Sequence, residues 1–109
     1  AEMATAVGLA LDWCGKDMAP DILKTSKNAL LEKAIKPGIG ITWENWWWVS
    51  EHNWNLVCHG GLAIAALAVF EEEPDLASYI LNRTVERFPL GLLPYQPDGA
   101  YNEGPGYWF

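Results

Sequence analysis

Two segments of this chain carry apolar residues on every side of a predicted helix, and this feature constrains the fold more than any other. The first, residues 2–14, is small and apolar nearly all round, so we expect it to be buried on most of its sides. The second is residues 53–70, whose large apolar positions are Leu56, Val57, Leu62, Ile64, Leu67 and Val69. Helices of this kind are stable only where other elements cover them. The pattern predicts an all-α chain with two inner helices.

Two amphipathic helices alternate with the inner ones. The first of them opens with Pro20 and ends before Pro37, and the other opens with Pro74. Proline in the first turn is typical of a helix start. The inner segments are centred about fifty residues apart, a spacing that indicates a helical-hairpin repeat. This order favours helical hairpins that form part of an incomplete α/α toroid. Because two hairpins cannot close a ring, we expect residues 1–109 to be a fragment of a longer chain.

Composition and charge exclude two classes of function. The 109 residues hold 14 acidic and 7 basic side chains, giving a net charge of −7, so the chain lacks the basic surface that nucleic-acid binding needs. The longest apolar run, residues 60–70, ends at an acidic triplet and is too short to cross a bilayer. No secretory signal opens the sequence. We therefore expect no nucleic acid and no membrane span.

The cysteines and histidines predict neither a disulfide nor a metal site. Cys14 and Cys58 each lie in an apolar helical context, where a buried free thiol is commoner than a disulfide. His52 and His59 have no clustered acidic or cysteine partners. We predict no metal and no other cofactor.

Tryptophan is unusually dense in one part of the chain, since five of the seven lie within residues 43–54. One interpretation is a core filled by aromatic rings. The other is a platform on which sugar rings stack, because the apolar faces of pyranoses pack well on indoles. The sequence leaves both interpretations open.

The helical pattern ends at Pro89, and a loop rich in proline, glycine and aromatic residues follows. Pro97-Asp98-Gly99 is a strong turn signal. Gly104-Pro105-Gly106 allows the backbone to approach a ligand closely. We expect this segment to be an ordered loop.

Three motifs together resemble the heparinase II/III-like polysaccharide lyases and the related alginate-lyase toroids. They are Leu11-Asp12-Trp13 at a helix end, His52-Asn53-Trp54-Asn55 at a helix start, and Pro97-Asp98-Gly99 followed by Glu103-Gly104-Pro105-Gly106-Tyr107-Trp108. The resemblance covers nearly the whole chain, and its most specific part is the last motif following the second by about fifty residues.

This resemblance implies an enzyme that cleaves uronic-acid-containing glycans by β-elimination. It implies an acidic polysaccharide as substrate, a periplasmic or secreted location, and residues 1–109 as part of the catalytic toroid domain. It also implies that the remainder of a longer chain, including a β-rich domain with a further histidine, completes the site.

The resemblance implies that Asn53, with His52, neutralises the uronate carboxylate and that Tyr107 transfers the proton. A hydrogen α to a carboxylate is too weakly acidic to be removed until donors stabilise the enolate-like anion. A tyrosine can then act as base and afterwards as acid toward the leaving oxygen. Tyr101 is the alternative proton carrier. The alternatives to catalysis are an N-cap role for Asn53 and aromatic packing for Tyr107.

The remaining predicted site residues would bind substrate. His59 follows His52 by seven residues, so both would share a face if the helix began early, but a lone histidine in an apolar helix is more often a hydrogen-bonded core residue. The predicted substrate-binding residues are Trp47, Trp54, His59, Tyr101, Glu103 and Trp108.

Two other functions remain open. Asp98 and Glu103 could serve as the two carboxylates of a glycoside hydrolase on the same toroid. The structural alternative is that Asp98 forms its turn and Glu103 caps amides of the loop. A helical scaffold without catalytic activity is the third hypothesis, because a fold does not determine a function.

Overall fold

The computed structural model describes residues 1–40 and 42–107, the side chain of Tyr107 excepted. Within this range the chain contains helices and loops and no strand, which confirms the all-α class. The four longer helices are α1 (Glu2–Cys14), α2 (Pro20–Leu30), α4 (Asn53–Ala68) and α5 (Pro74–Arg87). The shorter helical segments are η1 (Gly15–Asp17), η2 (Leu31–Ile35), α3 (Lys36–Gly38), η3 (Trp46–Val49), η4 (Phe88–Tyr95) and η5 (Pro105–Tyr107).

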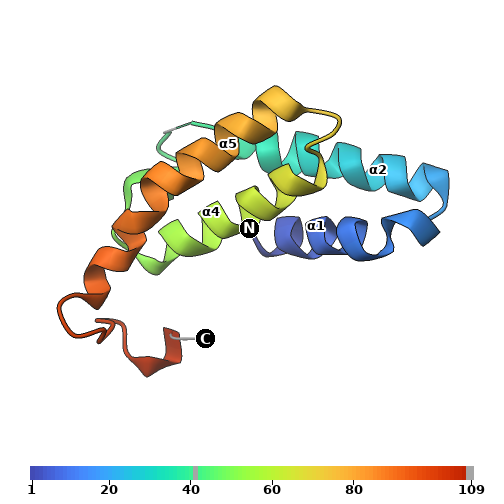
Figure 1. Ribbon diagram of the computed structural model, residues 1–109. Coiled ribbons are helices and arrows are strands. Elements are labelled where there is room, and N and C mark those ends of the chain that lie inside the picture. Colours follow the sequence, from blue (N-terminus) through green and yellow to red (C-terminus); the bar gives the residue numbers. More distant parts are fainter. Residues whose placement is uncertain (41, 108–109) are drawn as a thin grey trace.

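The longer helices form two antiparallel hairpins, α1 with α2 and α4 with α5 (Figure 1). Helix α4 lies at the centre, because it contacts α1 and α5 along its length and also contacts η2, η3 and η4. The molecule is elongated, with extents of 48 × 26 × 20 Å. The segment after α5 turns back below α4, and Glu103 in this segment contacts Asn53 at the start of that helix (Figure 1).

Helices α2 and α5 begin where the sequence predicts. Pro20 and Pro74 occupy the first helical position, and Asp21 and Asp75 lie in the first turn. A proline loses nothing there, since the N–H it lacks would have no partner, and an aspartate interacts favourably with the positive end of the helix.

The second predicted helix ends later than expected, because Pro37 lies inside it rather than beyond it. The turn Leu31–Ile35 is π-helical, and the N–H of Lys36 bonds to the carbonyl of Leu31. A proline in an α-helix clashes with the carbonyl four residues earlier and cannot donate to it. The wider turn just before Pro37 changes the hydrogen-bond register, and the helix continues through α3 to Gly38.

Two glycines allow α1 and α4 to pack closely. A β-carbon on Gly8 would lie 2.8 Å from the side chain of Ile64, and one on Gly61 would lie 2.8 Å from the carbonyl oxygen of Ala1. A residue larger than glycine at either position would therefore force the helices to move apart. The core forms between α4 and its neighbours, and its fully buried residues include Ile35, Trp48, His59, Ala65, Val69 and Ile80.

The prediction that the first helix is buried on most sides is wrong for the chain described here. Its buried residues are Ala4, Gly8 and Leu11, whereas Met3 and Trp13 are 75% and 74% exposed. The reason is that α2 and α4 cover one side of α1 only. Helix α4 likewise exposes Trp54, Val57 and Leu67.

Both cysteines are free thiols, but Cys14 is exposed at the end of α1 instead of buried. Cys58 is half-buried on α4, and burial raises the pKa of its thiol. None of the helices among residues 1–40 and 42–107 is long and apolar enough to span a membrane.

Candidate active site at the start of helix α4

His52, and not Asn53, caps helix α4. The backbone N–H of Trp54 donates to Nδ1 of His52 over 3.4 Å, and the backbone N–H of Asn55 donates to the carbonyl oxygen of His52 over 2.8 Å. Asn53 is the first helical residue. The alternative interpretation of Asn53 as the N-cap is therefore wrong, because the residue before it already accepts from the first turn.

The side chain of Glu103 lies at this helix start and contacts three side chains, two of which donate hydrogen bonds to it. Nδ2 of Asn53 donates to Oε2 over 2.6 Å, and the hydroxyl of Tyr101 donates to Oε1 over 2.9 Å. Nε2 of His52 lies 3.2 Å from Oε1. We call these four residues the Glu103 cluster; all four were predicted site residues. The prediction that Glu103 caps loop amides is replaced by these side-chain bonds.

The hydrogen bonds determine which nitrogen of His52 carries its proton. A backbone N–H can only donate, so Nδ1 accepts from Trp54 with its lone pair. In the neutral ring the hydrogen is then on Nε2, which lies 3.2 Å from Oε1 of Glu103.

Tyr101 is buried, with 6% of its surface exposed, and its ring stacks on that of Tyr95 with centroids 4.6 Å apart and planes 18° apart. Burial raises the pKa of the Tyr101 phenol, and the Glu103 carboxylate raises it further by accepting the hydroxyl hydrogen and by its charge. The phenol therefore holds its proton at neutral pH. Sequence reasoning missed Tyr95, because its spacing from Tyr101 gives no sign of stacking.

The Glu103 cluster opens to solvent beside two indoles. The side chains of His52 and Glu103 are 44% and 25% exposed. Trp46 meets the His52 ring edge-on at 5.8 Å, and both Trp46 and Trp54 are about half exposed. Trp54 is thus accessible to a ligand, its role in substrate binding stays a prediction, and Trp46 is an additional candidate. The triplet Trp46-Trp47-Trp48 alone could not indicate which ring faces out.

Trp47 and Trp48 instead fill the core, so the interpretation of Trp47 as a sugar platform does not fit this structure. Both are buried and stack on each other at 5.2 Å. The Nε1 hydrogen of Trp48 is donated to the carbonyl of Gly38 over 2.8 Å. Two rings that stack on each other inside the protein have little surface left for a ligand.

His59 lies in the same core, because α4 begins at Asn53 and His52 is outside the helix. Nδ1 of His59 donates to the carbonyl of Asn55 over 2.8 Å, and the ring stands edge-on to Trp47 and Trp48 at 5.0 and 4.7 Å. No part of His59 is exposed, so it cannot touch a substrate in this arrangement. The interpretation as a hydrogen-bonded core residue fits instead.

The charge state of His59 follows from this burial. Burial lowers the pKa of the His59 imidazole, the carbonyl of Asn55 opposes this effect, and the positive charges of Arg87 and Arg83 lower the pKa further. Arg83 lies over the Trp48 ring at 5.7 Å. We call His59, Asn55, Trp47 and Trp48 the buried His59 cluster.

The loop turn is formed as predicted. Oδ1 of Asp98 accepts from the N–H of Ala100 over 3.1 Å, the N–H of Gly99 donates to the carbonyl of Tyr95, and Gly99 has φ +84°. Asp98 is exposed, so the turn-forming interpretation fits it. The backbone of Tyr107 ends η5. The side chain of Tyr107 and all of Trp108 lie outside the described residues, so their roles stay predictions.

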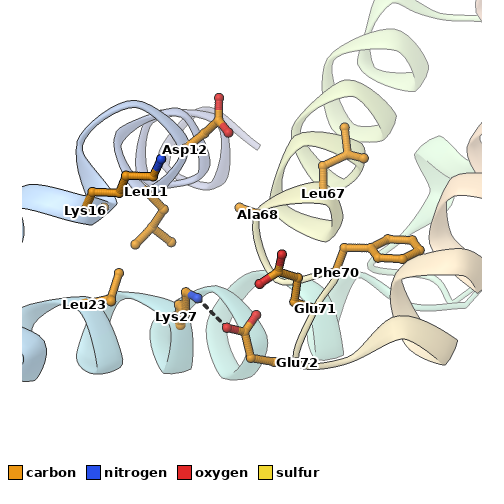
Figure 2. A pocket seen from close by; sticks show the side chains of 11 residues that line it. Leu11, Asp12, Lys16, Leu23, Lys27, Leu67, Ala68, Phe70, Glu71 and Glu72 are labelled. Carbon is orange, nitrogen blue, oxygen red and sulfur yellow. Dashed lines mark hydrogen bonds and ion pairs between the residues drawn. The ribbon is translucent and has the colours of Figure 1, made fainter.

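A separate cavity of about 380 Å³ lies at the other end of α4 (Figure 2). It is lined by Leu11 and Asp12 of α1, by residues of α2, and by the α4–α5 connection, where Lys27 pairs with Glu72. None of the described site residues lines it. Within residues 1–40 and 42–107, no group of three or more histidine, cysteine, aspartate or glutamate side chains is placed to hold a metal ion.

No model of a known protein family matches this chain, and neither does any curated protein. The geometry of the Glu103 cluster and the motifs that carry the resemblance are therefore the features that bear on function.

Proposed function

We propose that this chain is part of the catalytic domain of a polysaccharide lyase that cleaves uronic-acid-containing glycans by β-elimination. One observation carries the proposal: the Asn53 amide and the loop that leads to Tyr107 meet at a solvent-facing helix start, joined by Glu103. These are the two motifs, far apart in the sequence, whose residues the reaction would need together.

The chemistry needs donors at the uronate carboxylate. When a base removes the hydrogen α to that carboxylate, negative charge moves onto the carboxylate oxygens, and hydrogen-bond donors fixed in advance stabilise it. The electron pair then forms a carbon–carbon double bond as the bond to the leaving oxygen breaks, and an acid protonates that oxygen. The Asn53 amide and the positive end of α4 supply suitable donors.

Tyr107 remains the proposed proton carrier, because Tyr101 is poorly suited to be a base. The Tyr101 hydroxyl is buried and donates to a carboxylate, and both effects raise its pKa. A base in this reaction must instead lose its proton readily near neutral pH. Tyr107 follows Glu103 by four residues on the same loop, and Glu103 bonds to the Asn53 amide.

The exposed apolar surface supports a larger toroid. Met3 and Trp13 on α1 and Leu67 on α4 lie largely in solvent, whereas an apolar helix face is normally covered by another element. Further hairpins of a longer chain would cover it. The proposed substrate is an acidic polysaccharide and the proposed location is the periplasm or the exterior of the cell, both from the resemblance of the motifs.

The hydrolase alternative is less well supported. A hydrolase needs one carboxyl group as a proton donor. Asp98 is exposed and accepts in its own turn, and both oxygens of Glu103 already accept hydrogen bonds. Neither side chain is arranged as the acid.

The test is to incubate the full-length protein with a panel of uronate polysaccharides and neutral polysaccharides, and to record ultraviolet absorbance and new reducing ends. A lyase gives both signals on a uronate polymer, because elimination creates an unsaturated product that absorbs. Reducing ends without absorbance would indicate the hydrolase. If no polymer is cleaved, the scaffold hypothesis replaces the proposal.

A further inference from the structure

We infer that Glu103 orients the Asn53 amide toward the uronate carboxylate, and that His52 is a positioning residue that holds Glu103. The inference rests on the proposed lyase function. It assigns different roles to neighbouring residues that the motif alone would treat as a pair.

His52 and Tyr101 both contact Oε1 of Glu103. Nε2 of His52 lies 3.2 Å from Oε1, and Nδ1 of the same ring accepts from the N–H of Trp54. The hydroxyl of Tyr101 donates its hydrogen to Oε1. Asn53 instead binds Oε2, and its amide has a second N–H group that can donate to a substrate.

Glu103 also decides which way round that amide lies. The two ends of an asparagine amide have nearly the same shape but opposite hydrogen-bonding character, so the hydrogen-bond network alone selects the orientation. An ionised carboxylate can only accept. Bonding to Oε2 therefore turns the NH₂ group of Asn53 toward the cluster and its oxygen away. With the amide reversed, an oxygen would face the uronate and repel it.

The same contact joins the loop to the helix. Glu103 precedes Gly104, whose φ is +88°, and a β-carbon added at Gly104 or Gly106 would meet no atom of the described residues within 4 Å. The bond between Asn53 and Glu103 links positions fifty residues apart. Loss of Glu103 should thus disturb the geometry between Asn53 and the loop more than it disturbs folding.

The test is a double-mutant cycle in the full-length protein, with Asn53→Ala, Glu103→Gln and the double variant measured on the best substrate. Glu71→Gln is the matched control, because it makes the same charge change at an exposed residue near the far end of α4.

We expect Glu103→Gln to lower kcat roughly tenfold to a hundredfold with little change in KM, and Glu103→Asp to recover part of the loss. In the Asn53→Ala background, Glu103→Gln should cost less than about twofold, since its effect passes through the missing amide. Independent, multiplying losses, or an unchanged kcat for Glu103→Gln, would overturn the inference.

A second measurement separates failure of this inference from failure of the proposed function. With selective ¹⁵N labelling of asparagine, the two amide hydrogens of Asn53 should exchange with solvent at different rates, because Glu103 protects one of them. The difference should shrink in Glu103→Gln, while thermal unfolding shows that the variant remains folded. Unchanged exchange in an active lyase rejects the inference alone. If the protein cleaves no uronate polymer, the lyase proposal fails. The proposed role of Glu103 and Asn53 toward the substrate is then rejected too, whatever the exchange rates show.

Discussion

The Glu103 cluster and the buried His59 cluster are built on the same helix, each around a histidine, but they differ in what surrounds that histidine. His52 is partly exposed, and its Nε2 lies 3.2 Å from a carboxylate oxygen of Glu103. His59 is fully buried between two indoles, and its Nε2 has no hydrogen-bond partner among the described residues. The Asn55 side-chain oxygen beside it is also without one. The comparison teaches that the neighbours of each histidine, and not its spacing along the helix, decide whether it serves polar chemistry or packing.

The charged groups around the two clusters also differ. The Glu103 cluster holds an acceptor at the positive end of α4, where an anion is favourable. The His59 cluster lies near Arg83 and Arg87, which oppose a charge on the imidazole. Changes at the first cluster should therefore alter turnover and leave folding largely intact, and changes at the second should alter folding. The predictions below test that division.

The largest effect is expected for Tyr107→Phe, which removes one hydroxyl and keeps the ring. If Tyr107 transfers the proton, turnover should fall roughly a hundredfold to ten-thousandfold with little change in substrate binding. The measurement is the rate of unsaturated product in the full-length protein. Near-normal turnover in Tyr107→Phe together with a large loss in Tyr101→Phe would identify the other tyrosine as the carrier.

Trp48→Ala should have the largest effect on stability, because Trp48 is 1% exposed, stacks on Trp47 and faces His59. Removing a buried aromatic side chain costs about 3–5 kcal/mol of unfolding free energy. Trp54→Ala is the matched control and should cost less than about 1 kcal/mol, because Trp54 is half exposed. Urea unfolding measures both. Equal losses would show that the division between the two clusters is wrong.

Asn53→Ala should reduce turnover roughly a hundredfold, as does loss of one donor to a developing anion. Its stability should fall by only about 1 kcal/mol, because His52 caps α4 and Asn53 contributes a single described side-chain hydrogen bond. Asn82→Ala, at an exposed position on α5, controls for loss of an asparagine. A variant that is destabilised by this amount yet fully active would return Asn53 to a structural role.

The sequence predicted the helices well because their signals are local. Pro20 and Pro74 indicate helix starts through the N–H they lack, and the structure begins α2 and α5 at these residues. The π-turn before Pro37 was not predictable, since a helix can stop before a proline or widen ahead of it, and packing of Ile35 in the core decides between them.

The site could be predicted only in part, for the same reason. His52, Asn53, Tyr101 and Glu103 were selected from motifs, but their bonds cross up to fifty residues and depend on how the loop folds back. The sequence could not separate His52 from Asn53 as the cap, because both side chains can accept from a first turn. Burial of Trp47 and exposure of Trp46 also follow from tertiary contacts.

His59→Gln should change how stability depends on acidity. The pKa of native His59 is lowered from 6.5, so as pH falls below about 6.5 the unfolded chain binds a proton that the native chain does not. The contribution of His59 to the free energy of unfolding is thus present above that pH and is lost on acidification. The free energy falls by at most about 1.4 kcal/mol per pH unit from this cause. Urea unfolding from pH 7.5 to 5 should show a shallower decline for His59→Gln. His52→Gln is the control, and an equal change in both variants would contradict the comparison.

The smallest effect is expected for Tyr101→Phe, which removes the hydroxyl that donates to Glu103, while Asn53 keeps its hydrogen bond and His52 its contact. At neutral pH the loss should not exceed about 1.5 kcal/mol. The pKa of native Tyr101 is raised, so above about pH 10 the unfolded chain loses a proton that the native chain retains. The contribution of this phenol to the free energy of unfolding is therefore complete below pH 10 and is lost as pH rises through the native pKa. Urea unfolding between pH 8 and 11 should show this decline in the unmodified protein and not in Tyr101→Phe. Tyr79→Phe is the matched control, because Tyr79 is 44% exposed on α5.

Turnover of Tyr101→Phe should stay within a few-fold of the unmodified protein, since a hydroxyl that keeps its proton supports Glu103 without acting as the base. A hundredfold loss of turnover with unchanged stability would instead place Tyr101 in the proton transfer and remove Tyr107 from it.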